Sequence, residues 1–268
     1  MRLVSICPSN TELLGYLDLI PNLVGVDNDS TWPATIQNIP KVGLDLQIDI
    51  QKIKSLQPDL VLASLSVPGM EKNIEHLKKE NIPYIVLNPS SLDDIANDLQ
   101  TVADLTNKKE KATEILSRYH AFIHHYKELA QTVEVKRSVY FEWWPKPVFT
   151  PGGTNWLTEI SELCGATNIF SGKPIPSVQT DFSEVVRLNP DMMFMVWVGV
   201  EEQKMNVQHF KKREESHLLT AVKQNHLYSL EESLFCRPSP RLLVGMKKLA
   251  SLIHPTIFPK DDGIDPLL

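Results

Sequence analysis

One amphipathic stretch near the middle of the chain, Asn107 to Val133, limits what this sequence can fold into. Its apolar residues follow the i, i+3, i+4, i+7 spacing of a single helix face. They are Ala112, Ile115, Leu116, Tyr119, Phe122, Ile123, Tyr126, Leu129, Ala130 and Val133. At about 1.5 Å per residue the helix would be about 40 Å long. Because strand and helix patterns alternate on both sides of it, we interpret it as a strut joining two lobes, with a coiled-coil arm as the alternative.

The composition is that of a soluble globular protein. The 268 residues are enough for two lobes, and 42% of them are apolar and 22% charged. A net charge of −6 leaves no basic stripe for phosphates, so we expect no nucleic-acid partner. No apolar run approaches the about 18 residues of a membrane span. The start shows no secretory leader, which predicts a cytoplasmic chain unless a native leader was removed.

Three cysteines, Cys7, Cys164 and Cys236, are odd in number and far apart, so they predict buried or half-buried thiols rather than disulfides. The sequence also lacks the common nucleophile, phosphate-loop, dinucleotide and zinc-protease motifs. We therefore expect no enzymatic activity and no resident cofactor or metal.

Three histidines in the long helix, His120, His124 and His125, could suggest a metal site because residues four apart share a helix face. This face lies opposite the apolar stripe and is flanked by Arg118 and Lys127. We interpret it as a solvated polar face.

The chain contains an internal repeat. Residues Asp49–Ser64 align without a gap on Asp181–Val196, including the first aspartate and a central Pro-Asp pair. Later in each half, Asn81–Leu87 and Asn225–Leu230 are short strands that begin with asparagine. Two matches in the same order predict a duplicated α/β lobe, and a cleft between two lobes is a usual place for a small ligand.

The first lobe begins with a predicted strand at Leu3–Ile6 and a capping box at Ser9–Glu12, which would open a helix over Thr11–Leu17. A second strand follows at Leu23–Val26. Strand, helix and parallel strand place their loops at one sheet edge, where ligands tend to bind. In the second lobe, Glu142–Gly153 is predicted to be a loop.

Tryptophans are the main candidate ligand contacts. Trp143, Trp144 and Trp197 fall in loops or at strand ends of the second lobe, and Trp32 falls in a loop of the first. Such side chains can hold a large, flat, partly apolar ligand. The alternative is that they cover sheet edges.

A stiff loop, Phe235–Arg241, precedes the last predicted helix, Leu242–Ile253. Its two prolines fix the backbone, so Arg237 and Arg241 can present charge to a phosphate or an amide. A surface salt bridge is the alternative interpretation of Arg241.

Several segments resemble the helical-backbone class (class III) of ABC-importer substrate-binding proteins. The segments that carry this resemblance to the class are Ser5–Leu13, Val24–Val26 and Pro58–Val61. Those that look like its cobalamin-binding (vitamin B12/iron-chelate) branch are Glu142–Pro147, Thr150–Gly153, Asn168–Phe170 and Leu234–Arg241. The likeness runs from Arg2 to about Pro255.

The resemblance implies an α/β fold of two Rossmann-like lobes with parallel sheets, joined by one long helix, with a ligand cleft between the lobes and modest hinge motion. The expected divisions are residues 1–105, 106–133 and 134–268. The implied function is capture of a bulky corrinoid, cobalamin, for an ABC importer. Alternatives are a haem or ferric-siderophore binding protein and a leaderless cytoplasmic corrinoid carrier, sensor or processing enzyme. The family acts outside the cytoplasm, the expected partner is an ABC permease, and we expect a monomer.

By that resemblance the ligand site is lined by Pro8, Ser9, Asn10, Trp32, Trp143, Trp144 and Phe235. To these the loop arguments above add Trp197 and Arg237. Cobalamin importers place two further tryptophans where this chain has Asp45 and Ser64. A corrin ring would then be held mainly by the second lobe.

The resemblance also implies one permease-docking glutamate on each lobe, seven residues before the Pro-Asp turn. This chain has Gln51 and Ser183 there. Glu184 is a weak substitute, because one residue turns a helical side chain by about 100°. Lys52 has the wrong sign for an arginine partner. We expect docking on an unusual permease or none.

Overall fold

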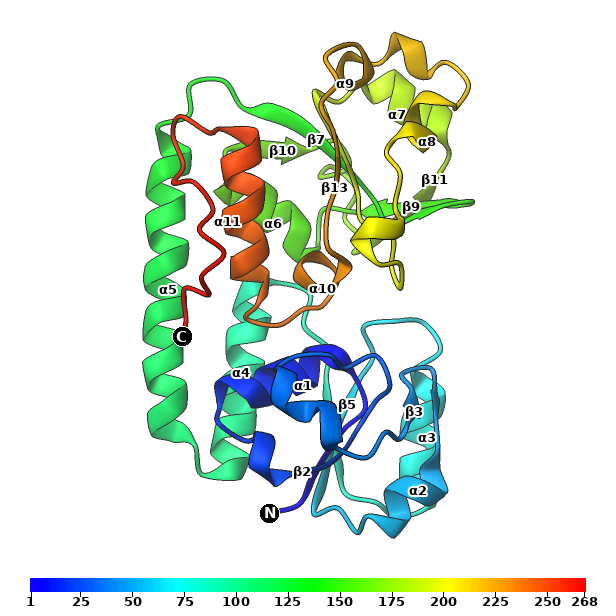
Figure 1. Cartoon of the computed structure of the whole chain (residues 1–268), viewed down its shortest axis with the longest axis vertical. Helices are drawn as coiled ribbons and strands as arrows, with labels where there is room; N and C mark the ends of the chain where they lie inside the picture. The colour runs from blue at the N-terminus through cyan, green and yellow to red at the C-terminus, as the bar shows by residue number, and fades with distance from the viewer. The chain divides into compact units, whose positions relative to one another are not determined.

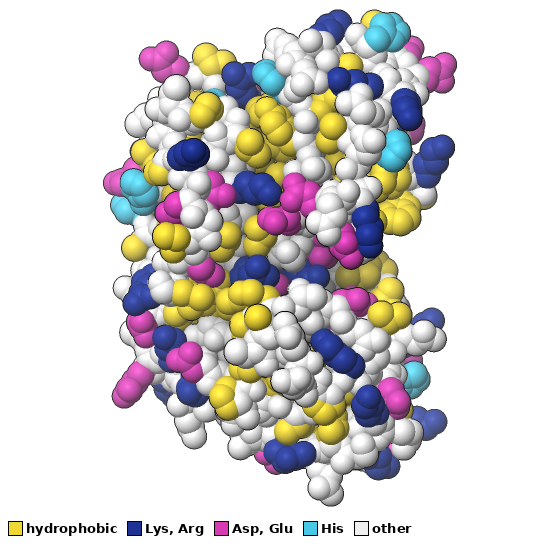
Figure 2. Space-filling model, viewed as in Figure 1, with side chains coloured by type: hydrophobic (Ala, Val, Ile, Leu, Met, Phe, Trp, Pro, Cys, Tyr) yellow, Lys and Arg dark blue, Asp and Glu magenta, His cyan; other side chains and the backbone are white.

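The computed structural model describes residues 1–268, which divide into two compact units. The first unit comprises residues 1–89, 93–117 and the terminal Leu268, and the second comprises 90–92 and 118–267. The predicted long helix is confirmed as α5, Lys109–Gln131, and it contributes residues to both units (Figure 1). On the face shown in Figure 2, basic and acidic side chains are interspersed rather than gathered in one stripe.

The first unit is a parallel sheet with the strand order β2-β1-β5-β6. Its strands are β1 (Leu3–Ser5), β2 (Leu23–Val26), β5 (Leu60–Ser64) and β6 (Tyr84–Leu87). Its main helices are α1 (Pro8–Tyr16), α2 (Ile50–Ser55), α3 (Glu71–Lys79) and α4 (Leu92–Thr106), with a small hairpin of β3 (Gly43–Leu44) and β4 (Gln47–Ile48). Figure 1 shows α1 and α4 on one side of this sheet and α2 and α3 on the other. Every residue of β5 is buried, as expected for a strand covered on both faces.

The second unit repeats this plan with the parallel order β10-β7-β12-β13. Its strands are β7 (Arg137–Glu142), β10 (Ala166–Asn168), β12 (Met192–Met195) and β13 (Leu227–Ser229). An antiparallel sheet of β8 (Trp144–Pro145), β9 (Val148–Pro151) and β11 (Ser177–Thr180) is added to it. The helices of this unit are α6 (Trp156–Leu163), α7 (Phe182–Leu188), α8 (Gln208–Lys211), α9 (Thr220–Lys223), α10 (Glu232–Phe235) and α11 (Leu242–Ile253).

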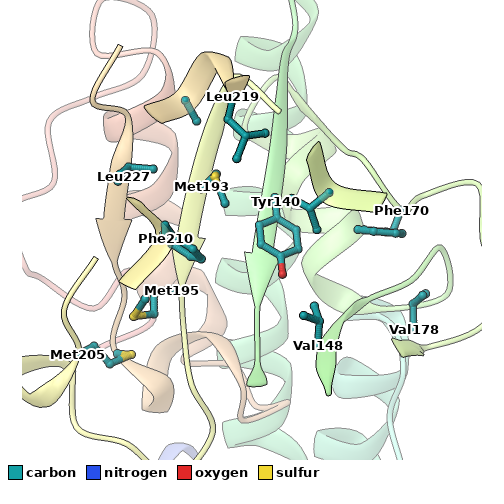
Figure 3. Close-up of a cluster of buried hydrophobic side chains, with 12 residues drawn as sticks. Tyr140, Val148, Phe170, Val178, Met193, Met195, Met205, Phe210, Leu219 and Leu227 are labelled. Atoms are coloured by element: carbon teal, nitrogen blue, oxygen red, sulfur yellow. The ribbon is translucent and has the colours of Figure 1, made fainter. Parts of the chain in front are cut away.

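The core of the second unit joins the two sheets. Tyr140 of β7 and Met193 and Met195 of β12 pack with Phe210 of α8. Val148 and Val178, from the antiparallel sheet, belong to the same cluster (Figure 3). Figure 3 shows the hydroxyl of Tyr140 at the end of the ring that lies toward Val148.

The predicted repeat is visible in the backbone hydrogen bonds. The N–H of Asp59 donates to the Arg2 carbonyl (2.8 Å), and the Asp59 carboxylate accepts from the Arg2 N–H (2.6 Å). Asp191 makes the same pair of bonds with Ser138, at 2.9 and 2.8 Å. In both units the aspartate of the Pro-Asp turn therefore fixes the start of the central strand.

The preceding helices match as well. Asp49 caps α2 by accepting from the Lys52 N–H, and Asp181 caps α7 by accepting from the Glu184 N–H, both at 3.0 Å. Asn81, which precedes β6, and Asn225, which precedes β13, also share one conformation, with φ of 54° and 57°. Asparagine is one of the few residues that tolerates this left-handed region.

The predicted capping box is wrong. Helix α1 begins at Pro8, with Cys7 as the N-cap residue, so Ser9 lies inside the first turn and its hydroxyl contacts the Cys7 Sγ at 3.3 Å. Proline favours the first helical position because its φ is already helical and it has no N–H to satisfy. This preference begins the helix three residues before the predicted Thr11.

The predicted loop over Glu142–Gly153 is also wrong for most of its length. β8 and β9 form a hairpin in which Trp144 lies opposite Phe149. The partner that completes this sheet, β11, comes from residues 177–180. A partner so distant in sequence leaves no local signal.

The duplication generates a stability prediction. Asp59→Ala and Asp191→Ala each remove a carboxylate that accepts a backbone N–H, so each should lower the free energy of unfolding by about 1–3 kcal/mol. Urea denaturation measures both values. Glu134→Ala, at an exposed position, is the control and should change little. A loss at one aspartate only would contradict the equivalence of the two turns.

Candidate functional site

The predicted site residues share one structural position: each follows the carboxyl end of a parallel strand. They follow β1 (Pro8, Ser9, Asn10), β2 (Trp32), β7 (Trp143, Trp144), β12 (Trp197) and β13 (Phe235, Arg237). Ligands of parallel α/β sheets bind at this edge. The two edges, one in each unit, are described separately below.

In the first unit the start of α1 is built into the fold. Ser9 and Asn10 are only 4% and 3% exposed. The Asn10 side-chain amide donates to the Ala63 carbonyl at 3.0 Å. This bond fixes the beginning of α1 against the end of β5.

Trp32 packs on the far end of the same helix. A Cβ added to Gly15 would lie 2.5 Å from the Trp32 ring, so the absence of a side chain at Gly15 makes room for the indole. The ring of Tyr16 lies 5.1 Å away. Gly15 is six residues beyond Ser9, about 9 Å along the helix axis. The structure therefore does not bring Trp32 together with Ser9 and Asn10.

Behind this edge lies a chain of polar contacts that sequence reasoning missed. Its last member, Asp27, is fully buried, and its Oδ1 accepts from the backbone N–H groups of Asp29 (2.9 Å) and Ser30 (2.8 Å). Consecutive oxygen contacts run from the Cys7 carbonyl to Ser5 (3.0 Å), Thr11 (2.8 Å), Ser30 (2.7 Å) and finally the Asp27 Oδ2.

A count of hydrogens links these polar contacts to the charge state of Asp27. The four contacts need four hydrogens, and the three hydroxyls provide one each. Ser30 cannot donate to both Thr11 and Asp27, so the fourth hydrogen is present only below the pKa of Asp27, when the carboxyl is protonated and can donate to Ser30. Burial, which disfavours the charged form, raises the pKa of Asp27 to about 6, although hydrogen bonds from Ser30 and Asp29 lower it.

In the second unit, Trp143 and Trp144 differ in environment. Trp144, the first residue of β8, is 45% exposed. Trp143 packs near Trp156, with ring centroids 6.3 Å apart, and its buried indole N–H has no hydrogen-bond partner in the protein. Trp144 therefore presents most of the free aromatic surface of the pair.

The loop after β13 is more tightly built than the sequence predicts. Phe235 is fully buried, and a Cβ at Gly245 would lie 3.2 Å from its ring, so the ring packs on α11. The Arg237 guanidinium pairs with Glu232 at 3.0 Å. The Arg237 charge is therefore balanced by Glu232, the first residue of α10.

Trp197 belongs to a buried polar cluster centred on Glu142, which has no exposed surface. The Trp197 indole N–H donates to the Glu142 Oε1 at 3.0 Å, and the Tyr140 hydroxyl donates to the Oε2 at 2.9 Å. The Arg213 guanidinium donates to both oxygens, at 2.5 and 2.6 Å. We call these four residues the Glu142 cluster.

Arg213 is itself enclosed. Its guanidinium carbon lies 4.6 Å from the ring centroid of Phe182 and 5.3 Å from that of Phe210. Burial acts to lower the pKa of Arg213, but the hydrogen bonds and charge of Glu142 outweigh burial and raise it. Arg213 therefore keeps its positive charge in this enclosed position.

The thiol and histidine predictions agree with the structure. Cys7 and Cys164 are buried and Cys236 is partly buried, and burial raises the pKa of Cys7 to about 11. His124 is exposed and contacts Glu128 at 3.3 Å.

No group of three or more His, Cys, Asp or Glu side chains is placed to hold a metal ion. None of the helices combines the length and apolar character needed to cross a membrane.

The docking candidate Glu184 is already engaged, because its carboxylate pairs with both Nε and Nη2 of Arg187, at 2.8 and 2.7 Å. At the equivalent helix of the first unit, Gln51 and Lys52 are exposed. Neither helix therefore presents an unpaired glutamate.

Comparisons with known proteins agree on one family. A family model described as periplasmic binding protein matches residues 3–234. The chain is 28% identical over 262 residues to YvrC of Bacillus subtilis, an uncharacterized ABC transporter substrate-binding lipoprotein, covering 96% of this chain and 81% of that protein. It is 28% identical over 242 residues to a vitamin B12-binding protein of Vibrio parahaemolyticus, covering 90% and 85%.

Solved structures share the fold. The periplasmic vitamin B12-binding protein BtuF of Vibrio cholerae superposes with a TM-score of 0.76 at 22% identity, over 95% of this chain and 96% of that one. IsdE of S. aureus, solved with heme, gives a TM-score of 0.83 at 21% identity, over 94% and 98%. At these identities the likeness establishes the mixed α/β fold with its parallel sheets.

The proton count at Asp27 predicts an unusual pH dependence. The pKa of Asp27 in the folded protein, about 6, lies above its ordinary value of 3.8, so stability from the neutral carboxyl is present at low pH. It is lost as pH rises through about 6, by about 3 kcal/mol in total. Asp27→Asn mimics the protonated carboxyl, and should therefore unfold at higher urea concentration than the parent at about pH 8 and at a similar one at about pH 4.

Asp29→Asn is the matched control, because Asp29 is exposed and neighbouring. It should leave the pH profile of the urea midpoint unchanged. An Asp27→Asn variant less stable than the parent at about pH 8 would contradict the prediction, because it would show that the ionised carboxylate stabilises the fold.

Proposed function

The chain belongs to the periplasmic binding protein family and is a substrate-binding protein of an ABC importer, and we propose that its ligand is a corrinoid of the cobalamin type. Relatives that align over most of the chain include proteins named for vitamin B12 binding. Members of the family act outside the cytoplasm, and one relative is named a lipoprotein. An extracytoplasmic location is therefore part of the proposal.

The observation that carries the proposal is the exposed indole of Trp144 at the carboxyl edge of the second sheet. Val198 follows Trp197 and is 44% exposed, and its N–H donates to the Trp143 carbonyl at 3.1 Å. The loops after β7 and β12 therefore run side by side and present apolar surface together. Figure 2 shows hydrophobic side chains reaching the surface of the second unit on the face in view. A corrin ring, which is broad and partly apolar, fits such a surface.

The first unit contributes a different chemistry. Asp45, at the β3–β4 turn, accepts from the Asn73 side-chain amide through its carbonyl at 2.6 Å, and Ser64 hydrogen-bonds to Ser66 at 3.0 Å. These polar residues stand where cobalamin importers are expected to have aromatic ones. This supports a ligand held mainly by aromatic side chains of the second unit.

Calorimetry with cyanocobalamin tests the ligand. We expect saturable binding to the parent protein and, for Trp144→Ala, an affinity lower by about 10- to 100-fold, as is common for a buried aromatic anchor. Ile264→Ala is the control, because Ile264 is 64% exposed and lies outside the strand edges. If the protein binds hemin or a ferric siderophore but not cyanocobalamin, the ligand is an iron chelate and the corrinoid proposal is wrong.

The permease is the expected partner, and the docking helices generate a second test. Because Gln51 and Ser183 replace the expected acids, the parent protein should bind a reconstituted cobalamin permease weakly. The Gln51→Glu, Ser183→Glu double variant should bind at least about tenfold more tightly, because two carboxylates can then pair with permease arginines. Gln51→Lys, Ser183→Lys is the charge-reversed control. Tight parent binding that disappears when the permease arginines are mutated would contradict this prediction.

A further inference from the structure

We propose that Glu142 and Arg213 are positioning residues that fix the indole of Trp197, and thereby set the affinity of the second unit for its ligand. This inference rests on the proposed function, because it takes Trp197, which precedes Val198, as part of the ligand surface. It goes beyond that proposal by naming two residues that need not touch the ligand.

The acceptor capacity of Glu142 is fully used. A carboxylate oxygen accepts about two hydrogen bonds. Oε1 accepts from Trp197 and Arg213, and Oε2 accepts from Tyr140 and Arg213. The Trp197 N–H therefore binds a site with no spare acceptor position. Rotation of the indole would remove one hydrogen bond from a buried carboxylate oxygen, which is costly because no water can replace the donor.

The donors come from separate parts of the chain. Tyr140 and Glu142 lie on β7, Trp197 lies just after β12, and Arg213 lies in the segment after α8. The backbone continues the pairing, because the Val196 N–H donates to the Glu142 carbonyl at 3.0 Å. Glu142 thus joins the strand that leads into Trp143 and Trp144 to the strand that leads into Trp197.

The internal repeat shows that this arrangement is specific to the second unit. Counting from the matched contacts of Arg2 with Asp59 and Ser138 with Asp191, position 142 corresponds to Ile6. Ile6 is 2% exposed and serves as an apolar core residue. A carboxylate at the equivalent buried position needs a cation, and the loop that carries Arg213 provides one.

Arg213 suits this role better than lysine would. Its planar fork binds both carboxylate oxygens, and the rings of Phe182 and Phe210 hold the fork in place. The fork leaves room at Oε1 for the Trp197 donor. A lysine, as a single rotatable point charge, keeps the charge balance but not this geometry.

The remaining contacts of Trp197 leave its orientation dependent on the cluster. The ring stacks on His209 with centroids 5.6 Å apart and planes 9° apart. Its backbone N–H contacts the Met205 Sδ at 3.3 Å. Stacking tolerates rotation in the plane of the ring, whereas the bond to Glu142 fixes the direction of the N–H.

Fluorine NMR on protein labelled with 5-fluorotryptophan tests the positioning directly. The protein has five tryptophans, so five resonances are expected, and Trp197→Phe identifies one of them. Arg213→Lys is the main variant, because Glu142→Gln leaves a buried guanidinium unpaired and lowers stability. We expect Arg213→Lys to shift or broaden the Trp197 resonance and to leave that of Trp32, in the first unit, unchanged.

Arg187→Lys is the matched control, because Arg187 also pairs bidentately with a glutamate in the second unit but is exposed. It should leave all five resonances in place. An unchanged Trp197 resonance in folded Arg213→Lys protein would overturn the positioning role.

Binding of cyanocobalamin then tests the effect on affinity. Arg213→Lys should weaken binding about tenfold in the parent protein and not at all in the Trp197→Phe background, because the pair acts through that indole. Equal losses in both backgrounds would show a general structural effect and overturn the inference. If the parent protein binds no cyanocobalamin, the proposed function fails, and the NMR result alone decides whether the pair positions Trp197.

Discussion

A buried carboxylate needs either a proton or a cation, and each unit of this protein meets that requirement differently. In the first unit burial raises the pKa of Asp27, which ends a chain of hydroxyl groups, to about 6. In the second, Glu142 accepts two hydrogen bonds from the Arg213 guanidinium. Both groups lie at or next to the carboxyl edge of a parallel sheet, so both hold the loops that carry the candidate ligand contacts.

The two arrangements tie down different aromatic side chains. Asp27 holds the turn that leads to Trp32 through backbone N–H groups of Asp29 and Ser30. Glu142 holds Trp197 directly. A duplicated fold has thus kept its backbone contacts, as at Asp59 and Asp191, while its buried polar chemistry has diverged.

Periodic and paired features of the sequence predicted much of the fold. The apolar stripe located α5 because it recurs at every helical turn. The gapless alignment located the equivalent turns because sixteen consecutive positions align in two parts of the chain. The start of α1 was misplaced because two local preferences compete there, a Ser–Glu cap and a proline at the first position, and the proline prevailed.

The site was harder to predict because its contacts link distant residues. The sequence identifies the tryptophans as candidates, but it does not predict which of them is exposed. Their exposure depends on the sheet in which β11 pairs with β9 from far along the chain. Glu142 does carry a local signal, because an acid at the end of a strand of buried residues is stable there only with a proton or a cation. Three adjacent basic residues, Lys211 to Arg213, offered no way to choose that partner without the structure.

The β8–β9 hairpin has a further consequence for the behaviour of the protein at high concentration. β8 is an edge strand, and an open edge with an exposed tryptophan invites pairing with a second chain. This edge is two residues long and continues into Lys146 and Pro147, while Pro145 within it has no N–H to donate. Trp144 can therefore stay exposed for a ligand while the backbone of β8 offers a second chain little surface for strand pairing.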